Sequence, residues 1–360
     1  MRIMNFIPCL SGGGAERQLS HLASHLIQNG NQVHIVYMAD GPVPTRWPQV
    51  ELHKLKFRSA HDFQLLIQMV RLIRRIKPNI LHTWNPQMDV LGGIASRITG
   101  IPWVIREANS AMNYSKSVKR RIRVRVASKV DALVSNSIGG DEYWHKKVPD
   151  DRRYIIRNSL PLEEMENAQP ERADLFLECG SPYLMFVGRL EYQKNVEAFL
   201  DAVAELNKTS AIDGVICGEG SLREKLETKS KQLGIDHRVC FTGHLPPVQI
   251  WGLMKQASLF YFPSRFEGCP NTIMEAMVCE CPVVVSDIPS HREILTMESA
   301  YFVNPADTRH TAEVIRNVLL RSGETTIRIR NAKQISNNWS ISKMAEQYEG
   351  IYEKLHEANL

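Results

Sequence analysis

The sequence predicts an α/β protein with two doubly wound, Rossmann-like domains that face each other across a cleft. Short β-branched or aromatic runs alternate with segments of helical period, which is the pattern of parallel sheets built from βαβ units. At 360 residues the chain is too long for one ordinary core. A polar, proline-punctuated stretch at 163–178 separates two such series and is expected to be a linker.

The first domain is expected at 1–162 and the second at 179–338. Strands of the first domain are expected at 2–7, 33–38, 51–55, 80–82, 103–105, 132–134 and 154–156. Those of the second are expected at 183–187, 214–216, 239–241, 259–262, 283–286 and 301–303. The first helix, about 15–29, should stop at Gly30, because glycine accepts the positive φ of a helix end. Residues 339–360 hold an amphipathic helix that we expect to pack back on the first domain.

Composition and charge are those of a globular protein with two different halves. No apolar run approaches the roughly 18 residues of a membrane span, and the N-terminal stretch lacks a signal-peptide pattern. Seven scattered cysteines favour reduced thiols and a cytoplasmic location. Residues 1–163 carry 24 Lys and Arg against 12 Asp and Glu, whereas the remainder carries 20 against 27. The two halves therefore differ in their electrostatics, the first being basic and the second acidic.

A glycine-rich turn, SGGGAER, lies between the first strand and the first helix. Gly13 and Gly14 allow the backbone to approach a phosphate or a sugar, with the positive helix end behind them. The dinucleotide pattern G-x-G-x-x-G fails because its third glycine is Arg17. Asp40, which could mimic a ribose ligand, precedes Gly41 and Pro42 and is typical of a turn. A redox enzyme is therefore disfavoured.

The stretch FVGRLEYQKN places two cations just after the first strand of the second domain. Arg189 follows Gly188 directly, and Lys194 comes five positions later. A planar guanidinium and a mobile ammonium beside a glycine suit a diphosphate. The alternative is a solvated loop with two ordinary surface cations, and this stretch alone does not decide between them.

Two glutamates stand eight positions apart in the apolar stretch PSRFEGCPNTIMEAMVCECPVVVSD. Glu267 is expected in a loop, and Glu275 in the first turns of a helix that begins at Asn271 and Thr272. That helix should bury Ile273, Ala276 and Met277. Its N-terminus offers N–H groups to an anion, and a carboxylate can accept hydrogen bonds from the vicinal diol of a ribose. A single glutamate would be read as a helix-start acid, but the pair beside two cations favours a binding site.

These motifs together resemble a retaining glycosyltransferase of the GT-B fold, in glycosyltransferase family 4 (group 1). The resemblance rests on E-G-C-P-N-T-I-M-E-A-M from Glu267, on G-R-L-x3-K from Gly188, on GEGSLREKLE from Gly218, and on the N-terminal GGGAER. It runs in order over essentially the whole chain, which makes it more specific than any single motif.

The resemblance implies a donor site on the second domain. Its catalytic residues would be Arg189 and Lys194, which hold the donor's diphosphate, and Glu267, which contacts the transferred sugar. Glu275 would bind the ribose, and the backbone at Gly13 and Gly14 would approach the donor. The substrate-binding set is Gly13, Gly14, Arg106, Asn109, Gly188, Gly218, Asn271, Thr272 and Glu275.

The resemblance also implies a reaction and its partners. A sugar would move from an NDP-sugar, UDP being favoured over GDP, to a hydroxyl of a glycan or lipid-linked acceptor, with retention. The pathway would be the biosynthesis of a cell-envelope polysaccharide such as O-antigen, capsule or exopolysaccharide. No Asp-x-Asp occurs in the sequence, so neither a metal nor another cofactor is expected.

Two positions depart from the family pattern. The family often has a histidine after the strand that here ends at Ile105, so either Arg106, Glu107 or Asn109 is expected to take its contact to the sugar, or another residue does. His82 is a weaker candidate. Glu280 stands where the family usually has glycine, and we expect the turn there to differ because a positive φ disfavours glutamate.

A basic helix is expected at 114–130, with Val118, Ile122, Val126 and Val130 buried. Its other positions are rich in lysine and arginine without one acid, so like charges repel at i,i+4 spacing. This favours an anionic membrane surface as partner, on the inner face of the cytoplasmic membrane. The expected membrane-binding residues are Lys119, Arg120, Arg121 and Arg123. Nucleic acid is not the expected partner because no aromatic residues interleave with the cations.

Two alternatives remain open from the sequence. A non-hydrolysing UDP-sugar epimerase of the same fold would need acid and base carboxylates in the cleft and would require no acceptor. A basic nucleic-acid-binding protein with a vestigial nucleotide site would bind RNA in a salt-sensitive way.

Overall fold

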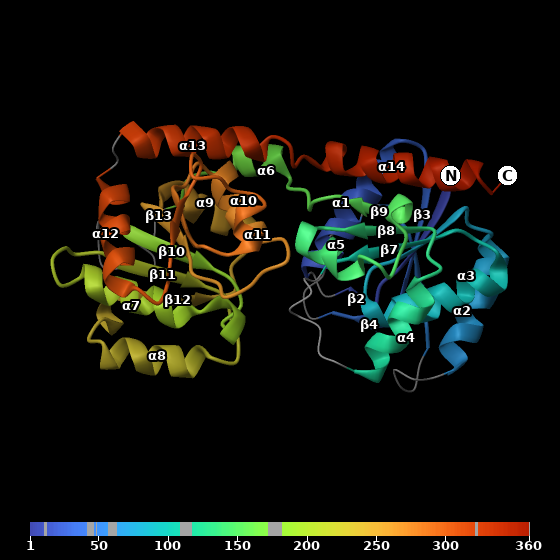
Figure 1. Cartoon of the computed structure of the whole chain (residues 1–360), viewed down its shortest axis with the longest axis horizontal. Coiled ribbons are helices and arrows are strands. Elements are labelled where there is room, and N and C mark those ends of the chain that lie inside the picture. Colours follow the sequence, from blue (N-terminus) through green and yellow to red (C-terminus); the bar gives the residue numbers. More distant parts are fainter. Residues whose placement is uncertain are drawn as a thin grey trace. The chain divides into compact units, whose positions relative to one another are not determined.

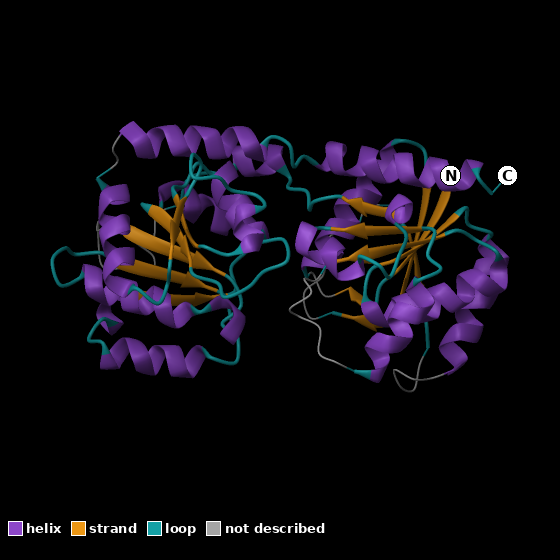
Figure 2. Ribbon diagram, viewed as in Figure 1, coloured by secondary structure: helices purple, strands orange, loops and turns teal. Residues whose placement is uncertain are grey.

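The computed structural model describes residues 1–10, 13–41, 47, 49–56, 63–108, 117–171, 182–320 and 323–359. It divides into two compact units. Unit 1 comprises Met1–Ser159 and Trp339–Leu360, and unit 2 comprises Leu160–Asn338. Each unit is built around a parallel sheet that is covered by helices (Figure 1 and Figure 2), so the expected α/β class is confirmed.

Unit 1 contains a seven-stranded parallel sheet in the order β5-β3-β1-β6-β7-β8-β9. Its strands are β1 (Arg2–Phe6), β3 (Gln32–Tyr37), β5 (Glu51–Lys54), β6 (Ile80–Thr83), β7 (Trp103–Glu107), β8 (Ala132–Ser135) and β9 (Arg153–Ile155). Two short strands, β2 (Cys9–Leu10) and β4 (Ala39–Asp40), form a separate pair that the sequence did not indicate.

The helices of unit 1 cover both faces of its sheet. They are α1 (Gly14–Gln28), α2 (Phe63–Ile76), α3 (Pro86–Thr99), α4 (Val118–Ala127), α5 (Ile138–Trp144) and α14 (Ile341–Glu357), and η2 (Asp150–Arg152) is a 3-10 turn. α1 is followed by Gly30, whose φ of +79° ends the helix as expected. α14 packs against α1 (Figure 1), and Tyr348 and Tyr352 bury their rings in the core beside Leu19.

Unit 2 contains a six-stranded parallel sheet in the order β12-β11-β10-β13-β14-β15. Its strands are β10 (Tyr183–Val187), β11 (Asp213–Cys217), β12 (Val239–Gly243), β13 (Leu259–Phe262), β14 (Val283–Ser286) and β15 (Tyr301–Val303). Its helices are α6 (Leu162–Asn167), α7 (Val196–Leu206), α8 (Arg223–Gln232), α9 (Pro247–Gln256), α10 (Asn271–Val278), α11 (Pro289–Arg292), α12 (Thr308–Leu319) and α13 (Gly323–Ser336), with 3-10 turns η4 (Tyr192–Lys194) and η5 (Asp236–Arg238).

The segment expected to be a linker, 163–178, is in part folded. Unit 2 begins at Leu160, and α6 packs against α9 and α10 with Met165 fully buried. Lys255 donates to the backbone carbonyls of Glu166 and Ala168 at 2.8 and 2.7 Å, which fixes the end of this helix. The polar composition that suggested a linker belongs to the exposed face of α6, and residues 172–181 lie outside the described part of the chain.

Candidate active site

The candidate site lies at the carboxyl ends of two neighbouring strands of unit 2. β10 and β13 pair in parallel, so the loops that follow them leave the same edge of the sheet. Gly188 follows β10, and the loop that contains Glu267 follows β13. The topology therefore brings together two motifs that lie about 75 positions apart in the sequence.

An ion pair between Lys194 and Glu267 joins the two loops. Lys194 Nζ lies 2.6 Å from Glu267 Oε1 and 4.7 Å from the centre of the Phe262 ring. The two side chains are only 13% and 6% exposed. Gln193 Nε2 donates to Glu267 Oε2 at 3.2 Å and to the carbonyl of Phe266 at 3.0 Å. Both carboxylate oxygens of Glu267 are thus held in place.

Two residues that the sequence interpretation missed fix the geometry of this ion pair. Gln193 reads as an ordinary polar loop residue, and only its contact with Glu267 reveals its role. Asn195 adopts a left-handed conformation with φ of +53°, which asparagine tolerates better than most residues. Its Nδ2 donates to the carbonyl of Pro263 at 3.1 Å, and Arg265 N donates to Gln193 O at 2.8 Å. Hydrogen bonds therefore tie the loop after β10 to the loop after β13.

The expected glycines Gly188 and Gly218 lie against each other. Gly218 has φ of +141°, and a Cβ atom built on it would stand 2.0 Å from the carbonyl oxygen of Gly188. A Cβ atom on Gly220 would stand 2.4 Å from Leu190 O. Glycine is required here because two backbone segments approach closely at the strand ends.

Arg189 is exposed next to this backbone. Its guanidinium donates to Gln193 Oε1 at 3.3 Å. The contact is long and lies at the surface, so the guanidinium is available to an anion at little cost. Arg189 and Lys194 together supply two positive charges at the edge of the sheet, as the sequence predicted.

α10 begins at Asn271, and its buried stripe of Ile273, Ala276 and Met277 is confirmed. Asn271 and Thr272 are half-buried in its first turn, and no side chain caps the helix from Pro270. Glu275 lies one turn further and is 5% exposed. The positive end of the helix dipole is thereby placed beside the loop that carries Glu267.

His291 is a further residue that the sequence interpretation missed. It lies in the short helix α11 after β14, and its ring centre lies 5.9 Å from that of Phe262, the ring that also contacts Lys194. Burial, helped by the charge of Lys194, lowers the pKa of His291 to about 4, and the carbonyl of Ser286 at 2.8 Å accepts from Nδ1. The ring is therefore neutral at pH 7, and its Nε2 has no hydrogen-bond partner among the described residues.

The expected site residues of unit 1 differ in where the structure places them. Gly13 precedes α1 as its cap, and Gly14 is the first helical residue, so both lie at the helix N-terminus as predicted. A Cβ atom on Gly13 would stand 2.6 Å from Glu16 Oε2. Asn109 lies outside the described residues.

Arg106 is not placed to contact a substrate, so that expectation is wrong. It is 2% exposed, and its guanidinium donates to the hydroxyl of Tyr348 and to Asn158 Oδ1. It also stacks 5.3 Å from the Trp84 ring. His82 is likewise buried and hydrogen-bonded to Tyr352 at 2.7 Å. Both side chains anchor α14, because partners from the end of the chain complete their environment.

The side chains that the basic helix α4 buries are not the ones that were expected. Arg123 is 4% exposed and pairs with Asp89 at 2.7 Å and Glu107 at 2.9 Å, so it is not a membrane-binding residue. Burial raises the pKa of Asp89 to about 6 although Arg123 opposes this shift. Val118 and Ile122, expected in the core, are 70% and 48% exposed. Two buried acids thus turn an arginine inward and leave apolar residues outside.

The turn at Glu280 does not differ from the glycine-type turn. Glu280 has φ of +56° at the end of α10, and its N–H donates to Met277 O at 3.2 Å. The expectation of an altered turn is therefore wrong. Glutamate occupies a left-handed position at the surface and bears the conformational cost.

Two family models match the chain. The model for glycosyltransferase family 4 matches residues 12–164, and the model for glycosyl transferases group 1 matches residues 167–335. The chain belongs to the group 1 glycosyltransferases. The matches together span almost the whole sequence, and the second includes the loops around Lys194 and Glu267. The expected enzyme class, a hexosyltransferase, is confirmed, and neither sequence-based alternative is supported by the family.

Two named relatives align with most of the length of this glycosyltransferase. An α-1,4-N-acetyl-D-galactosaminyltransferase of Campylobacter jejuni, named for a PP-undecaprenol-linked saccharide, is 25% identical over 97% of both chains. The lipopolysaccharide core biosynthesis mannosyltransferase LpcC of Rhizobium leguminosarum is 29% identical over 85% of both chains.

Among solved structures, HepE of Anabaena in complex with UDP and glucose has a similar fold. The TM-score is 0.83 at 18% identity, and the match covers 98% of this chain and 100% of that one. This likeness supports the GT-B fold that the sequence predicted.

Proposed function

We propose that this glycosyltransferase moves a sugar from UDP-sugar to a hydroxyl of a lipid-linked glycan, with retention of anomeric configuration. The pathway would be cell-envelope polysaccharide biosynthesis. The relatives named for undecaprenol-linked and lipopolysaccharide acceptors support the acceptor class. The UDP complex of HepE supports UDP over GDP. The observation that carries the proposal is the buried ion pair of Lys194 and Glu267 at the strand ends of β10 and β13.

In the proposed reaction the acceptor hydroxyl attacks the anomeric carbon on the face from which the diphosphate departs. The bond between the sugar and the diphosphate breaks, the glycosidic bond forms, and the hydroxyl proton passes to the leaving diphosphate. Negative charge therefore grows on the diphosphate. Arg189 and Lys194 would stabilise that charge because both cations are already in place at the strand ends.

The carboxylates would orient the donor. Glu275, 5% exposed in α10, would accept hydrogen bonds from the ribose diol. Glu267 would contact the transferred sugar with one oxygen while Gln193 holds the other. The first turn of α10 at Asn271 and Thr272 would supply backbone groups to the donor, and Gly188 and Gly218 would let the donor approach the backbone because they carry no side chain. A hydrogen bond to a charged group is worth about 1.5–3 kcal/mol, so loss of either glutamate should be measurable.

The membrane partner is proposed for the exposed face of α4. Val118, Lys119, Arg121, Ile122 and Arg125 are all exposed on this short helix. Apolar and cationic side chains side by side are typical of helices that lie in the interface of an anionic bilayer. Arg120 contributes less because its Nε donates to the hydroxyl of Tyr143 at 2.6 Å. The enzyme would act at the inner face of the cytoplasmic membrane, and no described helix is long and apolar enough to span a bilayer.

The test of the donor is a thermal-shift panel of UDP, GDP, ADP and NAD on the wild type and on Glu275→Ala. A ligand at about 100 times its dissociation constant adds about 2.7 kcal/mol of stability. We expect UDP alone to stabilise the wild type and to lose that effect in the variant. Glu163→Ala, which removes an exposed glutamate of α6, is the control and should respond as the wild type does. Stabilisation by NAD, or by no nucleotide, would refute the proposed donor.

A further inference from the structure

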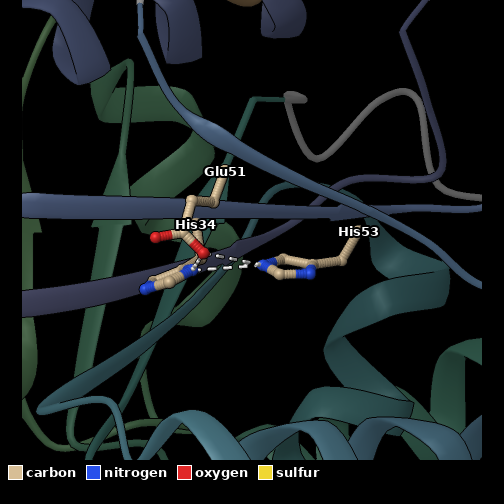
Figure 3. Close-up of side chains that lie close together, drawn as sticks. All are labelled: His34, Glu51 and His53. Carbon is tan, nitrogen blue, oxygen red and sulfur yellow. Dashed lines mark hydrogen bonds and ion pairs between the residues drawn. The ribbon is translucent and has the colours of Figure 1, made fainter.

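Two histidines and a glutamate converge on neighbouring strands at the edge of unit 1. In the parallel pairing of β3 and β5, His34 stands opposite Glu51, and Val36 stands opposite His53. Alternate residues of a strand point to the same face, so Glu51 and His53 share the face of His34. Figure 3 shows the three side chains directed toward one another.

The atoms that meet are all capable of ligating a metal. His34 Nδ1 lies 3.1 Å from His53 Nε2 and 3.3 Å from Glu51 Oε2, and His53 Nε2 lies 4.0 Å from Glu51 Oε2. In a tetrahedral zinc site, with ligand distances of 2.0–2.2 Å, ligand atoms lie about 3.4 Å apart. The three separations lie on either side of this value, so one cation can reach all three atoms after small shifts.

Hydrogen bonds alone do not satisfy every polar atom of this cluster. If His34 Nδ1 carries the proton, one N–H must serve both His53 Nε2 and the carboxylate, and the contact between His53 and Glu51 joins two acceptors. A cation accepts all three lone pairs at once.

We propose that His34, Glu51 and His53 bind a divalent transition-metal ion of the Zn²⁺ class, with water as a fourth ligand. Imidazole nitrogens with one carboxylate suit zinc better than magnesium or calcium, which prefer oxygen ligands. Water can enter because the Glu51 side chain is 69% exposed, whereas His34 and His53 are 5% and 18% exposed.

The charges around the cluster are compatible with this ligand set. Arg2 and Arg75 face the histidines and disfavour a cation. The Arg2 guanidinium is engaged by Gln32 at 3.0 Å and by backbone carbonyls at the end of α2. The Glu51 carboxylate offsets part of the metal charge. The ion would tie the edge strand β5 to β3, and it would take no part in sugar transfer.

The test uses the full chain without a histidine tag, after dialysis against a chelator. Titration with Co²⁺ should produce the absorption bands of a tetrahedral site at one ion per chain, and Zn²⁺ should displace them. His53→Ala and Glu51→Gln should each weaken Zn²⁺ binding at least tenfold. Glu51 is exposed, so Glu51→Gln tests the site even if a histidine variant folds poorly. Zn²⁺ should also raise the thermal unfolding temperature of the wild type.

His25→Ala is the matched control, because it removes a histidine that lies 3.5 Å from a glutamate elsewhere in unit 1. It should bind Zn²⁺ as the wild type does. Absence of a one-to-one Co²⁺ complex, or equal binding by wild type and His53→Ala, would show that the cluster is a hydrogen-bonded histidine pair. Because the readout is metal binding, the result does not depend on the proposed donor or acceptor.

Discussion

Glu280 adopts a backbone conformation that is unfavourable for glutamate. It holds a left-handed conformation, φ of +56°, at a helix end where glycine would be free of strain. We expect Glu280→Gly to stabilise unit 2 by about 1 kcal/mol, because the left-handed conformation costs an L-residue about that much. This should raise the melting temperature by about 2–4 °C in calorimetry. Glu280→Ala keeps the Cβ atom and should show no such gain; an equal gain would contradict the explanation.

Lys194 and Glu267 are expected to act as one catalytic pair. Lys194→Ala removes the charge proposed to stabilise the leaving diphosphate and leaves Glu267 buried without its cation. We expect kcat to fall by about 10²–10³, the usual effect of losing one transition-state contact. Because the pair is coupled, the double variant with Glu267→Ala should lose less than the product of the single losses.

The control for this comparison of single and double variants is Lys225→Ala. It also breaks a Lys–Glu pair of unit 2, with Glu197 at 2.7 Å, but Lys225 is 68% exposed. Steady-state kinetics should show it unchanged. Multiplicative losses in the double variant would mean that the two side chains act independently.

At the scale of elements, α4 carries the membrane hypothesis. Anionic vesicles should sediment the wild type at low salt, and each basic residue near such a surface contributes about 1 kcal/mol. Reversing both Lys119 and Arg121 to glutamate should therefore weaken binding at least tenfold. The matched control reverses Arg71 and Arg74, two exposed cations on α2 of the same unit. If α2 and α4 variants lose binding equally, only net charge matters and α4 is not a docking surface.

Elements were predictable where one local pattern decides them. β10, β13 and β14 have the bounds expected from their apolar runs, because a strand buried on both faces needs little else. α4 was predicted as a helix but with the wrong face inward. The reason is tertiary: Arg123 is drawn inside by Asp89 and Glu107, acids from other elements that no helical period within α4 reveals.

The same limit holds for the candidate site. The sequence motifs predicted that Lys194 and Glu267 follow strand ends. In the structure their side chains form an ion pair. Gln193 and His291 could not be found, since their roles come from contacts across loops 70 to 100 positions apart. The cluster of His34, Glu51 and His53 depends on the register between β3 and β5, which a shift of one residue would destroy.

For the whole molecule, acid should weaken both units through buried histidines, among them His21 in unit 1 and His291 in unit 2. The pKa of His21 in unit 1 and of His291 in unit 2 is lowered from 6.5 to about 4, chiefly by burial. Between these values the unfolded chain binds protons that the folded chain does not, so stability is complete above pH 6.5 and falls as the pH approaches 4.

We expect His291 alone to cost about 2 kcal/mol between pH 7 and pH 5. His291→Asn retains a donor for Ser286 O but does not titrate. Urea unfolding of unit 2 at the two pH values should show a smaller loss for this variant than for the wild type. An equal loss in both proteins would mean that other groups govern the acid sensitivity.

The position of α14 has a consequence for how the protein is made. Unit 1 is assembled from two stretches of chain, and all of unit 2 lies between them. A ribosome therefore delivers unit 2 whole while unit 1 still lacks the helix that supplies Tyr348 and Tyr352 to its core. Until then Arg106 and His82 have no hydroxyl partners for their buried polar groups. Unit 1 therefore begins before unit 2 in translation and completes its core only after unit 2 has been made.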